Sequence, residues 1–339
     1  MWPSLQIDLE KIQHNTKMIN ARVQESGGYL VGVTKVTGGD PFVAKAMIAG
    51  GVHALGESRM ANIHRLRLSG ITTPILLMRS PILREVEQVV AEVDISLNSE
   101  QKVLHALARA ALQQETTHEV ILMTDLGDGR EGVSPDLLPQ LVSYARGLEG
   151  LVVRGIGVNL ACFSGVIPKI VHMQQLQALA AQCDLRDNAY LSGGNSSALP
   201  LLFSTEPSAL ARINHWRIGE SILFGWDILT QAALPSCQQH VCQLTAEIIE
   251  VQTKLSPSGR MEKRAIVALG TQEIGTGQVY PLNPGLAVVG ASSDHLILRV
   301  RHETTITVGN RVEFTLDYSS LMAVATCPYV RIEYRTEVD

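Results

Sequence analysis

Residues 29–56 contain YLVGVTK (29–35), the amphipathic stretch FVAKAMIAGG (42–51) and HALG (53–56). The first and last segments are continuous apolar runs of strand length, and the middle segment has the period of a helix. Strands that are apolar on both faces and alternate with helices are typical of a parallel sheet covered by helices. This part of the chain therefore predicts a strand–helix–strand unit.

The same alternation continues to about residue 225. The further predicted strands are PILLM (74–78), DISLN (94–98), EVILMTD (119–125), LVVRGIGVN (151–159), AYLSG (189–193) and INHWR (213–217), and helical patterns between them include ILREVEQVVAE (82–92), EQKVLHALARAALQQ (100–114) and IPKIVHMQQLQALAAQ (167–182). Eight units within about 200 residues is the number that closes a (β/α)8 TIM-like barrel. An open doubly wound sheet is the alternative, but its usual G-x-G-x-x-G does not follow the first strand.

The pattern changes after Leu229, where short alternating runs replace the helical period. These runs are LTAEIIEVQT (244–253), RAIVALG (264–270), LAVVGA (286–291), HLILRVR (295–301), RVEFTLDY (311–318) and YVRIEY (329–334). They predict a C-terminal antiparallel β domain, with KLSPSGRMEK (254–263) as an exposed loop. We place the barrel at residues 10–228 and the β domain at 229–339, and we expect the strand LQIDL (5–9) to join the β domain.

Composition excludes several classes of protein. The 28 Lys and Arg against 33 Asp and Glu give a net charge of −5 without a basic run, which is untypical of nucleic-acid or membrane-surface binding. No apolar run approaches the roughly 20 residues of a membrane span, and the first residues lack the pattern of a signal peptide, so we expect a cytoplasmic protein. The five cysteines form no CxxC pair and the ten histidines no HExxH motif, so we expect neither disulfides nor a metal site.

Polar residues gather where the predicted barrel strands end, which is where barrels of this type carry their chemistry. They are Lys35, Arg79, Asn98, Asp125, Asp128, Arg130, Asn159, the run Ser192-Gly193-Gly194-Asn195-Ser196-Ser197, Arg217, Gly219 and Glu220. A lysine at a strand end is in most proteins a solvated charge, so its position alone does not mark Lys35.

The Gly-Gly-Asn-Ser-Ser run suits a phosphate, because glycines allow close backbone approach and free N–H groups and hydroxyls donate to an anion. The alternative is an ordinary turn with a serine N-cap. Barrel enzymes often bind phosphate after their seventh and eighth strands, and Lys35 ends the first strand, next to the eighth in a closed barrel. This arrangement suits a cofactor with a phosphate at one end and an aldehyde at the other, with Arg217 between them as a donor to a ring nitrogen.

These residues resemble the fold-type III pyridoxal 5′-phosphate (PLP) enzymes typified by alanine racemase, and most closely the alanine/ornithine racemase branch. The resemblance runs almost end to end through IDLEKIQHN, GVTKV, GESRMAN, DLGDGREGV, GIGVNLACFSGVIP, SGGNSS, RIGESILFG, GASSDHLIL and TCPYV. It implies a barrel with a C-terminal β domain, PLP as the cofactor, racemisation of a free amino acid, and a homodimer with shared active sites.

The resemblance also implies roles for individual residues. Lys35 matches the Schiff-base lysine, and Arg217 matches the arginine that hydrogen-bonds the pyridine nitrogen. Arg130 matches the arginine that contacts the cofactor's phenolic oxygen and the substrate carboxylate, and Asn159 replaces a histidine that stacks on the ring. The implied phosphate-binding residues are Asn195, Ser196, Gly219, Glu220 and Tyr329, with Ser197 in the same run.

Three departures from alanine racemases concern the site. Gly39 stands where they carry a phosphate-binding tyrosine, and Met123 stands at the position of their modified lysine, so Arg130 must be oriented in another way. Their second catalytic base is a tyrosine, but the matching stretch here is Leu-Gly-Thr-Gln-Glu at residues 269–273.

Racemisation needs a base on each face of the α-carbon. Lys35 serves one face, and we expect His295 from the partner subunit to serve the other, ahead of Asp294, Tyr318 and Cys162. The alternative is that Asp294 and His295 form only a buried hydrogen-bonded turn.

Four carboxylates, those of Asp128, Glu131, Glu273 and Asp294, favour a substrate with a terminal ammonium such as lysine or ornithine, with arginine as a further basic candidate, unless they are solvated loop charges. Two other functions fit the scaffold: decarboxylation of a D-diamino acid, which usually goes with a longer chain, and PLP carriage without catalysis, which usually goes without a β domain.

Overall fold

The computed structural model describes residues 3–205, 207–210, 212–255, 259–301 and 303–336. The chain divides into two compact units: Ile12–Lys35 with Gly39–Gln238, called here the barrel unit, and Met1–Lys11, Val36–Gly38 and Gln239–Asp339, called the β unit. Residues 229–238 thus group with the barrel. The domain ranges 10–228 and 229–339 stay a prediction.

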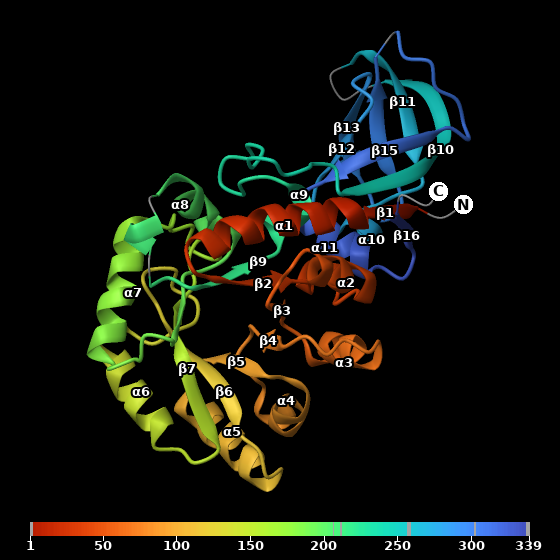
Figure 1. Cartoon of the computed structure of the whole chain (residues 1–339). Coiled ribbons are helices and arrows are strands. Elements are labelled where there is room, and N and C mark those ends of the chain that lie inside the picture. Colours follow the sequence, from red (N-terminus) through yellow and green to blue (C-terminus); the bar gives the residue numbers. More distant parts are fainter. Residues whose placement is uncertain (1–2, 206, 211, 256–258, 302, 337–339) are drawn as a thin grey trace. The chain divides into compact units, whose positions relative to one another are not determined.

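The barrel unit is built on a closed sheet of parallel strands in sequence order (Figure 1). The strands are β2 (Tyr29–Val33), β3 (Ala54–Glu57), β4 (Ile75–Leu77), β5 (Ile95–Asn98), β6 (His118–Thr124), β7 (Leu151–Val158), β8 (Tyr190–Ser192) and β9 (His215–Ile218). The barrel closes because β9 pairs in parallel with β2, with Arg217 opposite Val31. The predicted (β/α)8 barrel is confirmed, and each predicted strand is present within a few residues of its expected bounds.

Helices connect these strands and cover the outside of the barrel. They are α1 (Leu9–Glu25), α2 (Pro41–Ala49), α3 (Met60–Leu68), α4 (Val86–Glu92), α5 (Gln101–Gln113), α6 (Leu138–Arg146), α7 (Ile170–Gln182), α8 (Leu199–Ser204) and α9 (Glu220–Phe224). Helix α5 shows why they form: Leu104, Leu107, Ala108 and Ala111 are buried at helical spacing, and polar residues fill the other face. Helix α2 begins where the Asp40 carboxylate accepts two backbone N–H groups, with proline in the first turn.

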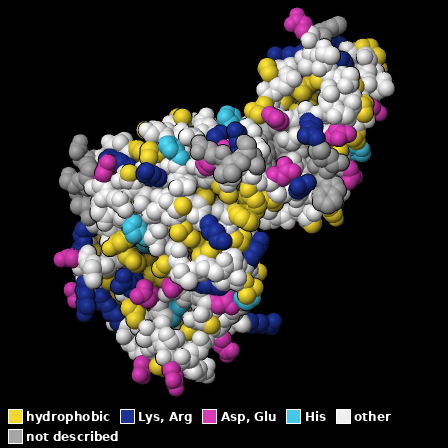
Figure 2. All heavy atoms as spheres, turned by 45° about the vertical axis from the view of Figure 1, so that its right-hand side comes forward, with side chains coloured by type: hydrophobic (Ala, Val, Ile, Leu, Met, Phe, Trp, Pro, Cys, Tyr) yellow, Lys and Arg dark blue, Asp and Glu magenta, His cyan; other side chains and the backbone are white. Residues whose placement is uncertain are grey.

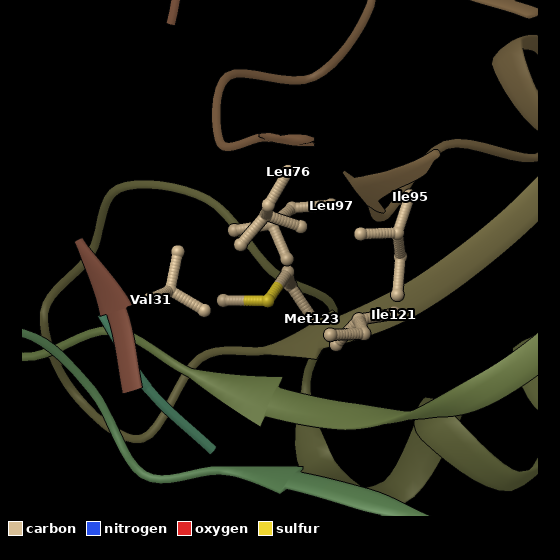
Figure 3. Packing of buried hydrophobic residues seen from close by; sticks show 6 residues of the cluster. All are labelled: Val31, Leu76, Ile95, Leu97, Ile121 and Met123. Carbon is tan, nitrogen blue, oxygen red and sulfur yellow. The ribbon is translucent and has the colours of Figure 1, made fainter. Parts of the chain in front are cut away.

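Apolar side chains fill the interior of the barrel. One cluster consists of Val31, Leu76, Ile95, Leu97, Ile121 and Met123, which come from β2, β4, β5 and β6 (Figure 3). Strands β2 and β6 stand on opposite sides of the closed sheet, so a cluster that includes both is packed across the interior. The chemistry is therefore confined to the ends of the strands.

The β unit contains an eight-stranded, mainly antiparallel sheet with the path β12-β15-β10-β11-β14-β13. Its strands are β1 (Ser4–Asp8), β10 (Cys242–Leu255), β11 (Met261–Val267), β12 (Val279–Pro281), β13 (Leu286–Ala291), β14 (Leu296–Val300), β15 (Arg311–Leu316) and β16 (Arg331–Arg335). The first strand joins this sheet as predicted: β1 pairs antiparallel with β10 and parallel with β16. In the predicted loop 254–263, β10 reaches Leu255 and β11 begins at Met261, while residues 256–258 lie outside the described residues.

Two short helices in this unit were not expected, α10 (Thr271–Ile274) and α11 (Tyr318–Thr326). Helix α11 begins at an N-cap, where Asp317 accepts a hydrogen bond from the Ser320 N–H at 2.7 Å.

In the part of the chain that the structure describes, no helix has the length and apolar character needed to cross a bilayer. Acidic and basic side chains are intermingled on the face shown in Figure 2.

Candidate active site

Lys35 is exposed and lies two residues after the end of β2, at the carboxyl-terminal edge of the barrel. The loop after β9 lies against the same strand end, because a Cβ on Gly219 would come within 2.7 Å of the Val33 carbonyl oxygen. Glycine is therefore the residue that this close approach permits. The closed barrel thus places the loop that begins at Gly219 against the strand that precedes Lys35.

The loops after β8 and β9 are joined by one hydroxyl group. Ser196 Oγ accepts hydrogen bonds from the N–H groups of Gly219 and Ser221, at 3.4 and 3.3 Å. Because both bonds use its oxygen as acceptor, the Ser196 proton stays available to donate to an anion. Asn195 caps the short helical turn that follows it by accepting the Ser197 N–H at 2.8 Å.

Ser221 supplies a test of whether this corner suits a phosphate. Its side chain is fully buried, and its Oγ has no hydrogen-bond partner in the structure. A buried hydroxyl without a partner costs free energy, so its persistence beside Ser196 fits a group that binds there. The residues present therefore fit an anionic group at this position.

Arg217 lies buried in β9, with 4% of its surface exposed. Its guanidinium donates to Ser192 Oγ and to the Val158 carbonyl oxygen, the second at 2.9 Å. Burial lowers its pKa to about 10, which leaves it charged at neutral pH. Ser192 Oγ also lies 2.8 Å from His215 Nδ1, and burial lowers the pKa of this histidine to about 3. A neutral His215 can accept at Nδ1, so we assign its proton to Nε2.

The loops after β6, β7 and β8 are tied together by amide and carboxylate groups. Asn195 Nδ2 donates to Asn159 Oδ1 at 3.1 Å, and Asn159 Nδ2 lies 3.4 Å from Asp128 Oδ2. The other oxygen of Asp128 accepts the backbone N–H groups of residues 162, 163 and 164 at 3.1–3.3 Å. With 1% of its surface exposed, this carboxylate organises the loops and is not a solvated charge.

Arg130 stands in the loop after β6 and forms an ion pair with its neighbour. Its Nε and Nη2 donate to the two carboxylate oxygens of Glu131, which raises the pKa of Arg130 above its usual value. Nη1 takes no part in these two bonds.

Comparison with known proteins identifies the family. A sequence profile of the N-terminal domain of alanine racemase matches residues 7–226. A lysine racemase from Thermotoga maritima is 32% identical over the whole of both chains, and an ornithine racemase from Acetoanaerobium sticklandii is 33% identical over 98% of this chain and 99% of its own. The chain belongs to the alanine racemase family. Solved alanine racemases from E. faecalis and Streptomyces lavendulae share the fold, with TM-scores of 0.75 and 0.78, 20% and 18% identity, and coverage of at least 97% of every chain.

Two family departures have a structural explanation. Met123, at the position of the modified lysine of alanine racemases, is 1% exposed and packs in the barrel core (Figure 3). Glu131 instead supplies the negative charge beside Arg130. At Gly39, φ is +65°, and a Cβ there would approach Asn62 Cβ to 2.7 Å. Asn62 thus leaves no room for a side chain at residue 39 in this backbone conformation.

Three predicted site residues lie in the β unit: Asp294, His295 and Tyr329. All three are exposed. Asp294 accepts hydrogen bonds from Gln272 Nε2 at 2.7 Å and from Ser293 Oγ at 2.6 Å. The turn that contains Asp294 and His295 is hydrogen-bonded, since Ser292 N donates to the His295 carbonyl oxygen, but it is not buried, so the alternative of a buried turn is wrong.

That exposed turn is attached to the segment where alanine racemases carry their tyrosine. Thr271 N and Gln272 N donate to the carbonyl oxygens of Ser292 and Ser293, at 2.9 and 3.1 Å. A Cβ on Gly270 would come within 2.1 Å of the Ser293 carbonyl oxygen. Glu273 caps the same segment by accepting the Gly270 N–H at 2.7 Å, so its carboxylate is engaged.

Sequence reasoning missed Glu57, which ends β3 and is fully buried. Its carboxylate accepts a hydrogen bond from the hydroxyl of Thr34, the residue before Lys35, at 2.9 Å. The available signal was a glutamate at the end of an apolar strand, in the GESRMAN stretch that carries the family resemblance. Among the residues described, no group of three or more His, Cys, Asp or Glu is placed to hold a metal ion.

Proposed function

We propose that this chain racemises a free basic amino acid, lysine or ornithine, with PLP bound at Lys35. The observation that supports it most is the position of Lys35, at a strand end beside the Ser196–Gly219 corner, in a chain that matches a lysine racemase over its full length. The family is PLP-dependent, and its racemases are isomerases.

The proposed cofactor contacts come from the barrel unit. The phosphate is held by Asn195, Ser196, Ser197, Gly219 and Glu220, and the further phosphate contact at Tyr329 stays a prediction of the family resemblance. Arg217 donates to the pyridine nitrogen, Asn159 lies at the ring, and Arg130 contacts the phenolic oxygen. The N–H groups and hydroxyls of the first set suit an anion, and Ser221 Oγ adds a buried hydroxyl that lacks a partner.

The side chains divide the work of moving the α-proton. When bound, PLP withdraws electrons from the α-carbon and makes its proton acidic enough for a side chain to remove. Lys35 acts as the base on one face, and Arg130 holds the substrate carboxylate through Nη1. Arg217 is a donor that cannot accept a proton from the ring, so the ring nitrogen stays unprotonated and protonation at the α-carbon is favoured over transamination.

For the second face we propose His295, assisted by Asp294. The turn that carries them is exposed and is hydrogen-bonded to residues 271–272, in the segment where alanine racemases place their tyrosine. In heavy water, His295→Asn should lose racemisation by about 10²–10⁴-fold but still exchange the α-proton of one enantiomer through Lys35. Equal loss of exchange from both enantiomers, with PLP still bound, would assign His295 to orienting the site.

We further propose a cytoplasmic homodimer in which the β unit of one chain supplies His295 to the barrel of the other. All five cysteines are free, which suits a reducing compartment. The barrel unit by itself supplies one convincing base, Lys35. A monomer with full activity in sedimentation at the assay concentration would rule out the shared site.

The test of the function is incubation of the PLP-loaded enzyme with L-lysine or L-ornithine, followed by chiral separation. The D-enantiomer should accumulate toward an equal mixture. Release of carbon dioxide from the D-diamino acid would indicate a decarboxylase, and absence of any conversion would indicate a PLP carrier.

A further inference from the structure

Thr34, the residue before Lys35, forms a hydrogen bond with each of its polar groups: the backbone N–H, the carbonyl oxygen and the side-chain hydroxyl. Its N–H donates to the Gly56 carbonyl oxygen at 3.0 Å, and its carbonyl oxygen accepts the Gly39 N–H at 3.2 Å. Its hydroxyl donates to Glu57 Oε1 at 2.9 Å, and the residue is fully buried. Two of these bonds are made by backbone atoms that any residue has, so the hydroxyl bond is the one that depends on the side chain.

Glu57 is fixed in turn by groups that can only donate to it. Oε2 accepts the Ser58 N–H at 2.9 Å and Asn62 Nδ2 at 3.1 Å. The amide of Asn62 is oriented by Arg65, which donates to Asn62 Oδ1 at 3.2 Å. With both donors committed to Oε2, the remaining oxygen of Glu57 is the acceptor for Thr34.

Burial of the Glu57 carboxylate costs free energy of folding. The carboxylate is fully buried, and its hydrogen-bond partners are neutral groups. Burial raises the pKa of Glu57, and the bonds from Ser58, Asn62 and Thr34 oppose that rise only in part. An apolar residue at the end of β3 would avoid the cost, and buried ionisable groups with perturbed pKa values cluster at functional sites.

We propose that Glu57 is a positioning residue for Lys35, which holds Thr34 so that the lysine enters the barrel mouth from one fixed backbone position. The proposal rests on the proposed function, in which Lys35 carries PLP and acts as a base. A catalytic group displaced by about 1 Å can lose roughly 10²-fold in rate, so a fixed turn in front of Lys35 has a direct effect on turnover.

Isosteric variants separate positioning from folding. Thr34→Val removes the hydroxyl and keeps the shape, and it should lower kcat by about 10–100-fold. Thr34→Ser keeps the hydroxyl and should restore kcat to within about threefold of the wild type. Glu57→Gln replaces one carboxylate oxygen with an amide N–H₂, which cannot accept the hydrogen bonds that Thr34, or Ser58 and Asn62, donate to that oxygen. This variant should therefore lower kcat as Thr34→Val does. Because both changes break the same link, the double variant should be little worse than either single variant.

The matched control is Thr16→Val. Thr16 is also fully buried, and its hydroxyl donates to the Ile12 carbonyl oxygen at 2.7 Å inside α1. This variant should lower Tm as much as Thr34→Val does, yet leave kcat within about twofold of the wild type, because it breaks a bond of the same kind away from the site. A second readout is the rate at which hydroxylamine strips PLP from the enzyme, which should rise in Thr34→Val and Glu57→Gln and not in Thr16→Val.

The outcomes are distinct. If wild-type enzyme does not bind PLP at Lys35, the proposed function fails and this role fails with it. If the wild type binds PLP and racemises, but Thr34→Val and Glu57→Gln keep their kcat and hydroxylamine rates, the positioning role alone is overturned. Additive losses in the double variant would overturn it as well.

Discussion

The guanidinium of Arg217 donates to the hydroxyl of Ser192, and the same hydroxyl lies 2.8 Å from Nδ1 of His215. The arginine is therefore held from one side by a serine and from the other by the Val158 carbonyl oxygen, which fixes its plane within the barrel mouth. No acceptor of a ring proton stands at that position, because a guanidinium donates only.

Replacing Arg217 by glutamate should change the reaction outcome. A carboxylate would hold the pyridine nitrogen protonated and strengthen electron withdrawal, so more turnovers should end in transamination. The measurement is the amount of PLP converted to its amine form for each racemisation event. This ratio does not depend on how much of the variant folds, and an unchanged ratio would show that Arg217 does not tune the ring.

Glu131→Gln should raise the KM for all amino-acid substrates alike. Both carboxylate oxygens of Glu131 are engaged by Arg130, so the loss should act through the arginine that we propose as the ligand of the substrate carboxylate. An exposed ion pair contributes up to about 1 kcal/mol, so the rise should be a few-fold. Steady-state kinetics with lysine and alanine distinguish the roles: a rise for lysine alone would mean that Glu131 contacts the side-chain ammonium.

The barrel could be predicted because its strands are buried on both faces and its helices on one. HALG and PILLM, for example, contain no motif that is specific to one fold, yet their apolar character and spacing were sufficient to predict strands β3 and β4. Helix α11 was missed because a short apolar run such as YSSLMAVAT fits a strand or a helix, and the deciding N-cap at Asp317 is a single residue.

The site was predicted less completely, because its supports connect distant parts of the chain. The positions of Lys35 and of the Ser196–Gly219 corner follow from strand ends, but nothing local shows that the Asp128 carboxylate accepts N–H groups 34–36 residues away. The sequence presented Asp128 as a candidate for the substrate ammonium. Its burial shows instead that it supports the loop.

Asp128→Asn should destabilise the loop after β7. The variant keeps an acceptor but loses the charge that strengthens three hydrogen bonds, which should lower the free energy of unfolding by about 1.5–3 kcal/mol. Urea unfolding gives this value, and hydrogen exchange at residues 162–164 should become faster. Asp125→Asn is the matched control, since Asp125 accepts N–H groups from Gly127 and Gly129 at exposed positions. An equal effect in both variants would contradict the special role of Asp128.

Acid should destabilise the barrel through its buried histidines. Burial lowers the pKa of His118 to about 4 and that of His215 to about 3, from 6.5. Between about pH 6.5 and 4 the unfolded chain binds protons that the folded chain does not, so stability falls as pH falls, by about 1.4 kcal/mol per pH unit for each histidine. Glu57 acts in the opposite sense, because its raised pKa favours the folded state as pH falls toward its usual value.

A variant isolates the histidine contribution. Tm should drop between pH 7.5 and 5.5 in the wild type, and it should drop less in His118→Gln, which cannot titrate. The same drop in both proteins would mean that His118 is not held neutral in the fold.

The central claim is that Lys35 carries the cofactor, and reduction with borohydride tests it most directly. PLP-loaded enzyme is reduced and digested with trypsin, and the modified peptide is identified by mass spectrometry. We predict a pyridoxyl group on Lys35 in a peptide left uncleaved at that residue, and permanent loss of racemase activity. A label on Lys45 or on any other lysine, or a reduced enzyme that remains active, would contradict the account.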